Sequence, residues 1–224
     1  MAEPVLALAR DFQHAVCMND DIGRIFCIGR NYAAHIEELG NSPDSGCVVF
    51  MKPVSALVAP GEPIRLPRGR GETHHEAELV VSVTGGGFDV PVESAYEWIA
   101  GITLGLDLTL RDLQRELKKS GQPWELAKSF DGSAPLGNFR PYNNQDLQNL
   151  QFECRVNREV RQRGDTSLML YPVFRLINIL SQSWALQPGD VIFTGTPAGV
   201  GPLKPGDTVE LSSPQLGPYR WTCE

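Results

Sequence analysis

The chain has 224 residues, of which 42% are hydrophobic, and its formal net charge is -7. This length is enough for a sizeable buried core, and the composition is typical of a globular protein rather than a disordered one. The acidic balance, without a long basic run, argues against nucleic-acid binding. No apolar stretch is long enough to cross a bilayer, so we expect no membrane partner.

The N-terminus and the cysteines together predict where the protein works. Residues 1–4, Met-Ala-Glu-Pro, lack the basic and apolar regions of a signal peptide. The five cysteines are an odd number without a Cys-x-x-Cys spacing, so we expect neither a disulfide framework nor a zinc site. A cytoplasmic protein with reduced cysteines is the simplest interpretation.

The first elements of the chain are short. The 22 glycines and 17 prolines divide the sequence into brief segments, which favours many short strands over long helices. We expect a strand over residues 25–28, a short helix over 31–39 and a strand over 48–51. The polar segment 41–46 between them is a possible lid. A small N-terminal appendage, residues 1–24, would precede one catalytic domain over residues 25–224.

The later elements follow from alternation, helical spacing and turn residues. In chain order we expect a strand over 102–109, a helix ending at 120–121, a hairpin turning at 157–158, a helix opened by Pro172, and Pro-Gly-Asp turns at 188–190 and 205–207 that each precede a strand.

A pair of glutamates, Glu76 and Glu78, stands in a segment that alternates like a strand. Two carboxylates on one face of a sheet repel each other unless a metal ion, a lysine or an arginine lies between them. Asp107 falls on the polar face of another expected strand. If the two strands are neighbours, three carboxylates would suit Mg²⁺, Mn²⁺ or Ca²⁺. The alternative is a solvated strand face with scattered acids.

Three further segments carry side chains that could take part in catalysis or substrate binding. His35 and Glu38 lie three residues apart on the expected helix, an arrangement suited to a base, although such pairs are often surface pairs. Lys128 has small and apolar neighbours, so its ammonium could stabilise an oxyanion or could simply be exposed. Arg30 could hold a substrate carboxylate or could be a surface arginine.

The glycine-rich segment 194–201 is not a phosphate-binding loop, because it lacks the Gly-Lys-Ser/Thr ending. A tight turn that brings backbone N–H groups and Thr196 to a ligand is the better interpretation. The sequence also lacks the Gly-x-Ser-x-Gly pattern of a serine nucleophile.

Six segments, taken together and in this order, resemble the fumarylacetoacetate hydrolase family. The resemblance is to its short members, of the acylpyruvate hydrolase and oxaloacetate decarboxylase type, and covers roughly residues 25–211. The matching segments are 29–35 (GRNYAAH), 52–53 (KP), 75–79 (HEAEL), 107–112 (DLTLRD), 127–130 (AKSF) and 194–201 (TGTPAGVG).

The resemblance implies a fold and a set of roles. The fold would be α+β but mostly β, a mixed β-sandwich roll with a few flanking short helices, and the protein would be a homodimer. The implied roles fall into three groups: metal ligands Glu76, Glu78 and Asp107; catalytic residues His35, Glu38 and Lys128, the first two activating water; and substrate-binding residues Arg30, Gln114 and Thr196.

The resemblance also implies an activity, which is Mg²⁺-dependent hydrolysis of a C–C bond in a small 2,4-dioxo acid with release of pyruvate. Mn²⁺ or Ca²⁺ could replace Mg²⁺. Decarboxylation of oxaloacetate and its keto–enol tautomerisation remain open, because both use the same metal site. A metal- or ligand-binding module without catalysis is the other alternative, and the intact pair of His35 and Glu38 argues against it.

Overall fold

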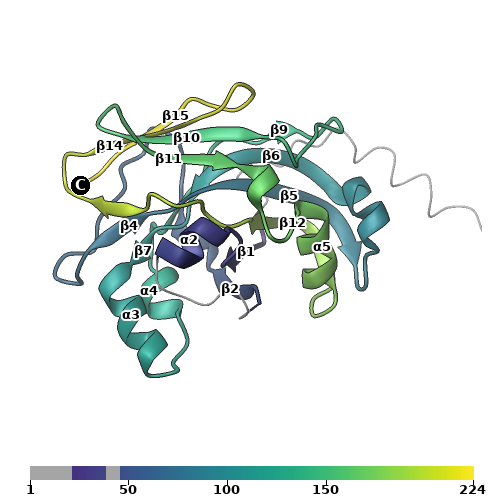
Figure 1. Ribbon diagram of the computed structural model, residues 1–224, viewed down its shortest axis with the longest axis horizontal. Coiled ribbons are helices and arrows are strands. Elements are labelled where there is room, and N and C mark those ends of the chain that lie inside the picture. The colour runs from purple at the N-terminus through teal and green to yellow at the C-terminus, as the bar shows by residue number, and fades with distance from the viewer. Residues whose placement is uncertain (1–21, 39–45) are drawn as a thin grey trace, which may run out of the picture.

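The computed structural model describes residues 22–38 and 46–224. Almost all of the expected lid and of the expected N-terminal appendage lies outside these residues. A six-stranded mixed sheet forms the centre of the molecule (Figure 1). Its strands, in spatial order, are β2 (Val48–Lys52), β1 (Arg24–Gly29), β12 (Leu186–Phe193), β5 (Ala77–Gly87), β6 (Ile99–Leu106) and β9 (Arg140–Pro141). Only β1 and β12 pair in parallel within this sheet.

Smaller sheets complete the β structure. The four-stranded sheet contains β11 (Glu159–Asp165), β10 (Gln151–Val156), β14 (Thr208–Ser212) and β15 (Tyr219–Thr222). A three-stranded sheet contains β13 (Gly201–Leu203), β4 (Thr73–His75) and β7 (Thr109–Leu110), and a pair contains β3 (Leu57–Val58) and β8 (Ala134–Pro135). Mostly β structure with few helices is the fold class that the sequence predicts.

The helices are short. They are α2 (Ala33–Glu38), α3 (Arg111–Lys119), α4 (Glu125–Lys128) and α5 (Val173–Ser181), with 3₁₀ turns η4 (Val54–Ala56), η5 (Val92–Trp98) and η6 (Thr166–Leu168). In Figure 1, α3 and α4 lie together at one end of the molecule, away from α5. No helix among the described residues is long and apolar enough to cross a membrane.

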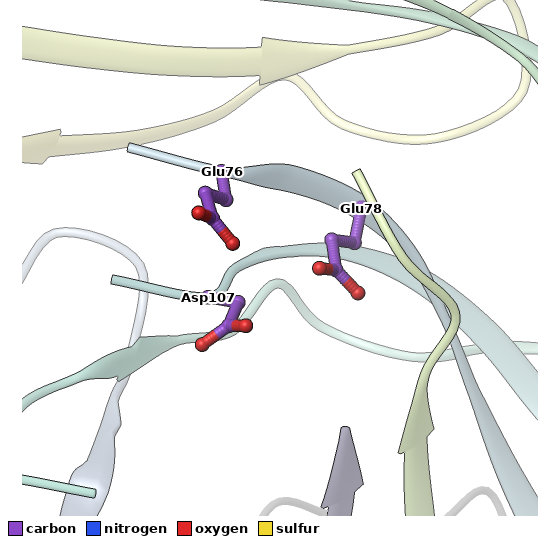
Figure 2. A group of neighbouring side chains, drawn as sticks. All are labelled: Glu76, Glu78 and Asp107. Carbon is purple, nitrogen blue, oxygen red and sulfur yellow. The ribbon is translucent and has the colours of Figure 1, made fainter. Parts of the chain in front are cut away.

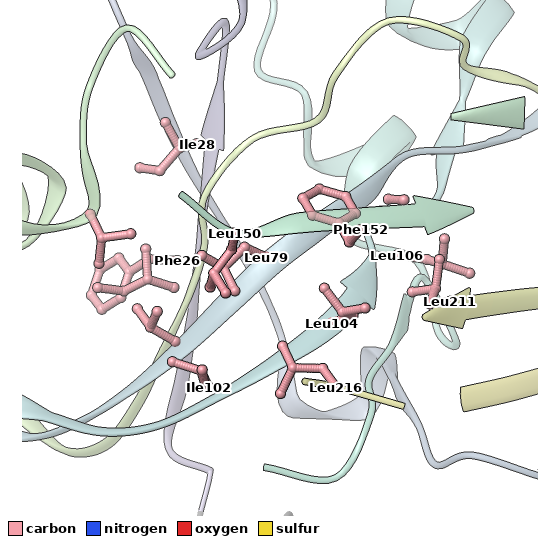
Figure 3. Close-up of a cluster of buried hydrophobic side chains, with 14 of the residues drawn as sticks. Phe26, Ile28, Leu79, Ile102, Leu104, Leu106, Leu150, Phe152, Leu211 and Leu216 are labelled. Atoms are coloured by element: carbon pink, nitrogen blue, oxygen red, sulfur yellow. The ribbon is translucent and has the colours of Figure 1, made fainter. Parts of the chain in front are cut away.

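The large core lies where the two main sheets meet. Leu79 of β5 and Leu104 of β6 share one apolar cluster with Phe152 of β10 and Leu211 of β14 (Figure 3). Val80, next to Leu79, belongs to a different cluster. The side chains of β5 therefore alternate as the sequence pattern predicts, and both faces of the strand are buried. Each fully buried leucine contributes about 1.5–3 kcal/mol to folding.

The turns confirm two expectations and correct one. Asn157 and Arg158, with φ of 53° and 73°, form the two-residue turn of a hairpin between β10 and β11. Residues 205–207 lie between β13 and β14, as expected. The prediction of a turn at 188–190 is wrong, because these residues lie within β12. The pairing of β12 with β5 shifts register there and Gly189 has φ of 84°, so the segment is an irregularity within a strand.

Candidate metal centre and catalytic cleft

Two strand ends bring the acidic residues together. Glu76 lies between β4 and β5, and Asp107 directly follows β6. The pairing of β5 with β6 sets Ala77 opposite Leu106, so Glu76 lies opposite Asp107. The N–H of Asp107 donates to the carbonyl of Glu76 at 2.8 Å. Glu78 is two residues further along, so all three side chains lie on one side of the sheet (Figure 2).

The three carboxylates form a compact and buried group. One oxygen from each of Glu76, Glu78 and Asp107 lies within 4.8 Å of the others, and each residue is at most 4% exposed. Figure 2 shows the three carboxylates pointing towards a common space. A donor set of oxygens without sulfur fits a hard divalent cation such as Mg²⁺, Mn²⁺ or Ca²⁺. The alternative of scattered acids on a solvated face is wrong for these residues.

Basic side chains also lie among the acids. The Nζ atom of Lys128 is 2.7 Å from Glu76 Oε2 and 2.6 Å from Asp107 Oδ2. Lys52 Nζ is 2.8 Å from Asp107 Oδ1, and Arg111 Nη2 pairs with Glu76 Oε1. The sequence leaves a metal ion, a lysine and an arginine as alternative partners of the acids. All three can contact the carboxylates at the same time, because each carboxylate oxygen has more than one lone pair.

Charge is distributed unevenly over the three acids. Burial opposes ionisation of Glu76, but Lys128 and Arg111 lower its pKa below the usual range. Burial and the neighbouring carboxylate of Asp107 raise the pKa of Glu78 well above its usual range. Glu78 has no salt bridge within residues 22–38 and 46–224, and the backbone N–H of Gly195 donates to it at 2.7 Å. Glu78 is therefore the acid that a bound cation would stabilise most in its ionised form.

The histidine–glutamate pair lies beside this group. His35 Nδ1 is 3.1 Å from Glu38 Oε2, and the N–H of Gly199 donates to both oxygens of Glu38 at 3.0 and 3.3 Å. If Nδ1–H donates to Glu38, Nε2 of His35 carries the free lone pair of a base.

A single cleft, which we call the catalytic cleft, brings most of the predicted site residues together. His35, Arg30, Gln114 and Lys128 all line it beside Glu76. Arg30 has φ of 65°, a conformation that is uncommon for a residue other than glycine and is often found at functional sites. The full lining is Gly29, Arg30, His35, Ile36, Phe50, Glu76, Arg111, Gln114, Lys118, Trp124 and Lys128.

The glycine-rich segment contacts the protein's own acids. Gly195 donates to Glu78 and Gly199 donates to Glu38, so these two N–H groups support site residues instead of meeting a ligand directly. Thr196 is buried; its hydroxyl donates to the carbonyl of Ala77 at 2.8 Å and accepts from Gln162 at 2.8 Å. It does not line the catalytic cleft, and its contact with substrate stays a prediction.

Three residues of the site received no role from the sequence. Lys52 and Arg111 fall within the segments that resemble the family, so the resemblance could have pointed to them. No motif in the sequence pointed to Gln162 of β11. Its amide oxygen accepts from Ala77 N–H at 3.0 Å and faces His75 Nδ1 at 2.9 Å, and its nitrogen donates to Pro197 O at 2.9 Å. Gln162 thus ties the acidic strand to the glycine-rich segment.

A buried acidic triad beside a histidine–carboxylate pair has the groups needed for acid–base chemistry assisted by a divalent cation. A family model described as the fumarylacetoacetate (FAA) hydrolase C-terminal domain matches residues 24–223. The chain belongs to this enzyme family, as the six segments predict.

Similar proteins are named for reactions of oxo acids. An oxaloacetate tautomerase of Escherichia coli is 42% identical over 193 residues, which is 85% of this chain and 88% of that protein. A mitochondrial oxaloacetate decarboxylase of Dictyostelium discoideum is 39% identical, over 84% and 87% of the two chains. The fumarylpyruvate hydrolase of Pseudomonas aeruginosa, solved with Mn²⁺ and pyruvate, has a TM-score of 0.86 and 38% identity, over 90% and 89%.

Proposed function

We propose that this protein is a Mg²⁺-dependent enzyme that interconverts the keto and enol forms of oxaloacetate. The observation that carries the proposal is that Glu76, a member of the buried acidic triad, lines one cleft together with Lys128 and His35. The E. coli tautomerase and the Dictyostelium decarboxylase support oxaloacetate as the substrate. Hydrolysis of a 2,4-dioxo acid, the main expectation from the sequence, therefore becomes the second candidate.

The balance of formal charge favours a substrate with two negative charges. With all three acids ionised, Glu76, Glu78 and Asp107 carry three negative charges, and Lys52, Lys128 and Arg111 carry three positive ones. A divalent cation held by Glu76, Glu78 and Asp107 would leave two positive charges in a buried region, where unbalanced charge is costly. The dianion of oxaloacetate would balance them.

Tautomerisation needs a base near carbon 3 and a stabiliser of charge on the 2-oxo oxygen. The bound cation would polarise the 2-oxo group and stabilise the negative charge that develops on its oxygen. His35, oriented by Glu38, would take a proton from carbon 3, and the imidazolium would deliver a proton to the oxygen. Lys128 uses two of its three N–H donors for Glu76 and Asp107, which leaves one for the substrate oxygen.

Hydrolysis is the second candidate, and a specific observation favours it. His35 and Glu38 form the pair that would deprotonate a water molecule, and the similar Pseudomonas enzyme is named a fumarylpyruvate hydrolase. Water attack on the distal carbonyl of a 2,4-dioxo acid would break a C–C bond and release pyruvate. Lys128 would again face the oxygen on which charge develops.

One assay separates these reactions. The purified protein is incubated with Mg²⁺ and either oxaloacetate or acetylpyruvate, while the enol absorbance and the pyruvate formed are followed. A tautomerase accelerates the change in oxaloacetate absorbance without pyruvate release, a decarboxylase produces pyruvate from oxaloacetate, and a hydrolase produces it from acetylpyruvate. No acceleration with oxaloacetate at saturating Mg²⁺ would refute the proposal.

The variant His35→Ala refines the result. Both tautomerisation and hydrolysis should fall by about 10²–10⁴-fold, because each needs the base. Decarboxylation should partly survive, since it needs stabilisation of the enolate oxygen but no attack by water. Unchanged tautomerisation in His35→Ala would assign the proton transfer to another group.

A further inference from the structure

Asn31 carries a buried amide that the proposed reaction does not use. It lies in the turn between β1 and α2 and is 1% exposed. Arg30 directly before it and His35 four residues after it both line the catalytic cleft, whereas Asn31 itself does not. An effect of Asn31 on catalysis would therefore have to act through its neighbours.

The amide of Asn31 joins three segments that are far apart in the chain. Its Nδ2 donates to the carbonyl oxygen of Thr194 at 2.7 Å and to that of Tyr171 at 3.0 Å, and its Oδ1 accepts from the N–H of Tyr171 at 2.7 Å. The backbone carbonyl of Asn31 also accepts from the N–H of Leu170 at 2.9 Å. These bonds fix the turn after β1 against residues 170–171 and against the end of β12.

The three side-chain contacts require an amide at this position. Two of the neighbouring groups are carbonyl oxygens, which need a donor, and the third is an N–H group, which needs an acceptor. A carboxylate in the same place would set an oxygen against the two carbonyl oxygens. An apolar side chain would leave all three backbone groups without this partner in a buried region, which is costly. Asn31 therefore meets a demand that residues of similar size do not.

Close packing at Gly195 supports the same connection. Gly195 has φ of 101°, and a Cβ there would lie 2.6 Å from the Cβ of Asn31. The N–H of Gly195 is also the donor to Glu78, one of the three candidate metal ligands. The turn after β1 thus packs directly against the residue that supports the acidic triad.

The two sides of this connection are held unequally. Thr194 is fixed independently of Asn31, because its N–H and its hydroxyl both donate to the carbonyl of Leu79 in β5, at 3.1 and 2.8 Å. The turn after β1 contains Arg30 with φ of 65°, a conformation that persists when the surrounding structure holds it. The bonds of Asn31 therefore hold the turn to the strand, and not the reverse.

Helix α2 transmits the position of the turn to the candidate base. The helix begins at Ala33, two residues after Asn31, and the N–H of Ile36 donates to the carbonyl of Tyr32 at 3.0 Å. Because a helix moves as a short rigid unit, a shift at residue 31 would move His35 with it.

We infer that Asn31 is a positioning residue that places His35 relative to the acidic triad. Its amide ties the start of α2 to the end of β12, next to the glycine that supports Glu78. The inference rests on the proposed function in one respect, namely that His35 transfers the proton.

The variant Asn31→Ala tests this role through a split between catalysis and metal binding. The value of kcat for oxaloacetate tautomerisation should fall by about 10²-fold, because misplacing a reacting group by about 1 Å can have an effect of this size. The dissociation constant for Mg²⁺, measured by calorimetric titration, should stay close to the wild-type value, since Thr194 and Glu78 keep their own supports. A large loss of Mg²⁺ affinity would overturn the inference, because it would mean general damage to the site.

A double-mutant cycle shows whether the loss passes through His35. In a protein that already carries His35→Ala, adding Asn31→Ala should lower kcat little further, because there is no base left to misplace. If the second change lowers kcat as much as it does in the wild type, Asn31 acts independently of the base and the inference is wrong.

A spectroscopic measurement tests the position of His35 without any substrate. The chain has four histidines, and the ring nitrogen signals of His35 in a ¹⁵N NMR spectrum can be assigned by their absence in His35→Ala. Asn31→Ala should shift these signals, because the contact between His35 Nδ1 and Glu38 changes with the position of α2. Unshifted signals would overturn the inference even if kcat has fallen.

Asn178→Ala is the matched control. Asn178 of α5 also uses its amide in two contacts, since it donates to the carbonyl of Val90 at 2.8 Å and accepts from Arg175 at 2.6 Å. It is not among the residues that line the catalytic cleft. Asn178→Ala should lose stability in urea unfolding but keep the wild-type kcat and His35 signals. An equal fall of kcat in both variants would contradict a special role of Asn31.

Asn31→Ser is the second variant and carries the test if Asn31→Ala does not fold. The serine hydroxyl can still donate to one backbone carbonyl, so the loss of stability should be smaller. The same pattern is expected, namely a lower kcat, an unchanged Mg²⁺ affinity and shifted His35 signals. A wild-type kcat in Asn31→Ser with unshifted signals would refute the positioning role.

The inference and the proposed function can fail separately. Shifted His35 signals in Asn31→Ala, in a protein that does not accelerate oxaloacetate tautomerisation, would support the positioning role and refute the proposed reaction. Acceleration of the reaction by the wild type, with unshifted signals in Asn31→Ala, would support the reaction and refute the positioning role.

Discussion

The backbone N–H of Gly195 donates a hydrogen bond of 2.7 Å to the carboxylate of Glu78. Four residues later the N–H of Gly199 donates to Glu38. One short segment therefore holds both a candidate metal ligand and the carboxylate partner of the candidate base. The relative position of these two carboxylates depends on the backbone conformation of residues 195–199.

Gly199→Ala should damage both stability and activity. Gly199 has φ of 97°, and a Cβ there would clash with the carbonyl oxygen of Arg161. We expect the free energy of unfolding, measured with urea, to fall by more than 2 kcal/mol, above the roughly 1–2 kcal/mol cost of the left-handed conformation alone. The value of kcat should also fall, because Glu38 moves with the loop.

Gly206→Ala is the matched control for this change. Gly206 has φ of 92° and nothing within 4 Å of its Cβ position, so an alanine there costs only the free energy of the left-handed backbone conformation. Equal stability losses in the two variants would mean that contact with Arg161 contributes nothing.

Asp107→Asn should reduce activity more than Glu38→Gln. A positioned base increases the reaction rate by about 10²–10⁴-fold. An enzyme usually lowers the activation free energy by about 8 kcal/mol or more in total, which is a larger effect than the base alone provides. The cation must supply much of the remainder, and Asp107 is one of its three candidate ligands. The measurement is kcat/KM for oxaloacetate at saturating Mg²⁺, and comparable values for Asp107→Asn and wild type would rule out the metal assignment.

Glu78→Gln should separate metal binding from folding. In the metal-free protein the change removes repulsion from Asp107 and Glu76 and retains an oxygen that can accept from Gly195. The melting temperature without Mg²⁺ should therefore equal or exceed that of the wild type. Mg²⁺ at one hundred times its dissociation constant should stabilise the wild type by about 2.7 kcal/mol and so raise its melting temperature. This rise should be absent in Glu78→Gln. A wild-type response to Mg²⁺ in this variant would exclude Glu78 as a ligand.

Gln162→Leu should destabilise the protein strongly. The change leaves the Ala77 N–H and the Thr196 and Pro197 oxygens without their buried partner, and each unsatisfied group costs about 1–3 kcal/mol. We expect a loss of more than about 2 kcal/mol in urea unfolding. Gln187→Leu, at an exposed position, is the control and should change stability by less than about 0.5 kcal/mol. Similar losses in both variants would contradict the bridging role of Gln162.

Local pattern was sufficient to place several elements that a short sequence signal marks. The strand around residues 25–28, the helix after Pro172 and the turn at Asn157 and Arg158 all appear where the sequence places them. The segment 188–190 does not, because its conformation is decided by pairing with β5 and by the contact of Asp190 with Arg24 at 2.6 Å. The homodimer and the cytoplasmic location stay predictions.

The sequence by itself determined the family, because six short segments in order carry the resemblance, and that resemblance implied the mostly β fold and the candidate ligands Glu76, Glu78 and Asp107. Only the tertiary structure decided what surrounds the acids. Lys52, Arg111 and Lys128 reach Glu76 and Asp107 from separate elements, and Gln162 reaches the site from the other main sheet. Such contacts join residues far apart in the chain, so they depend on how sheets and helices pack, which no local pattern specifies.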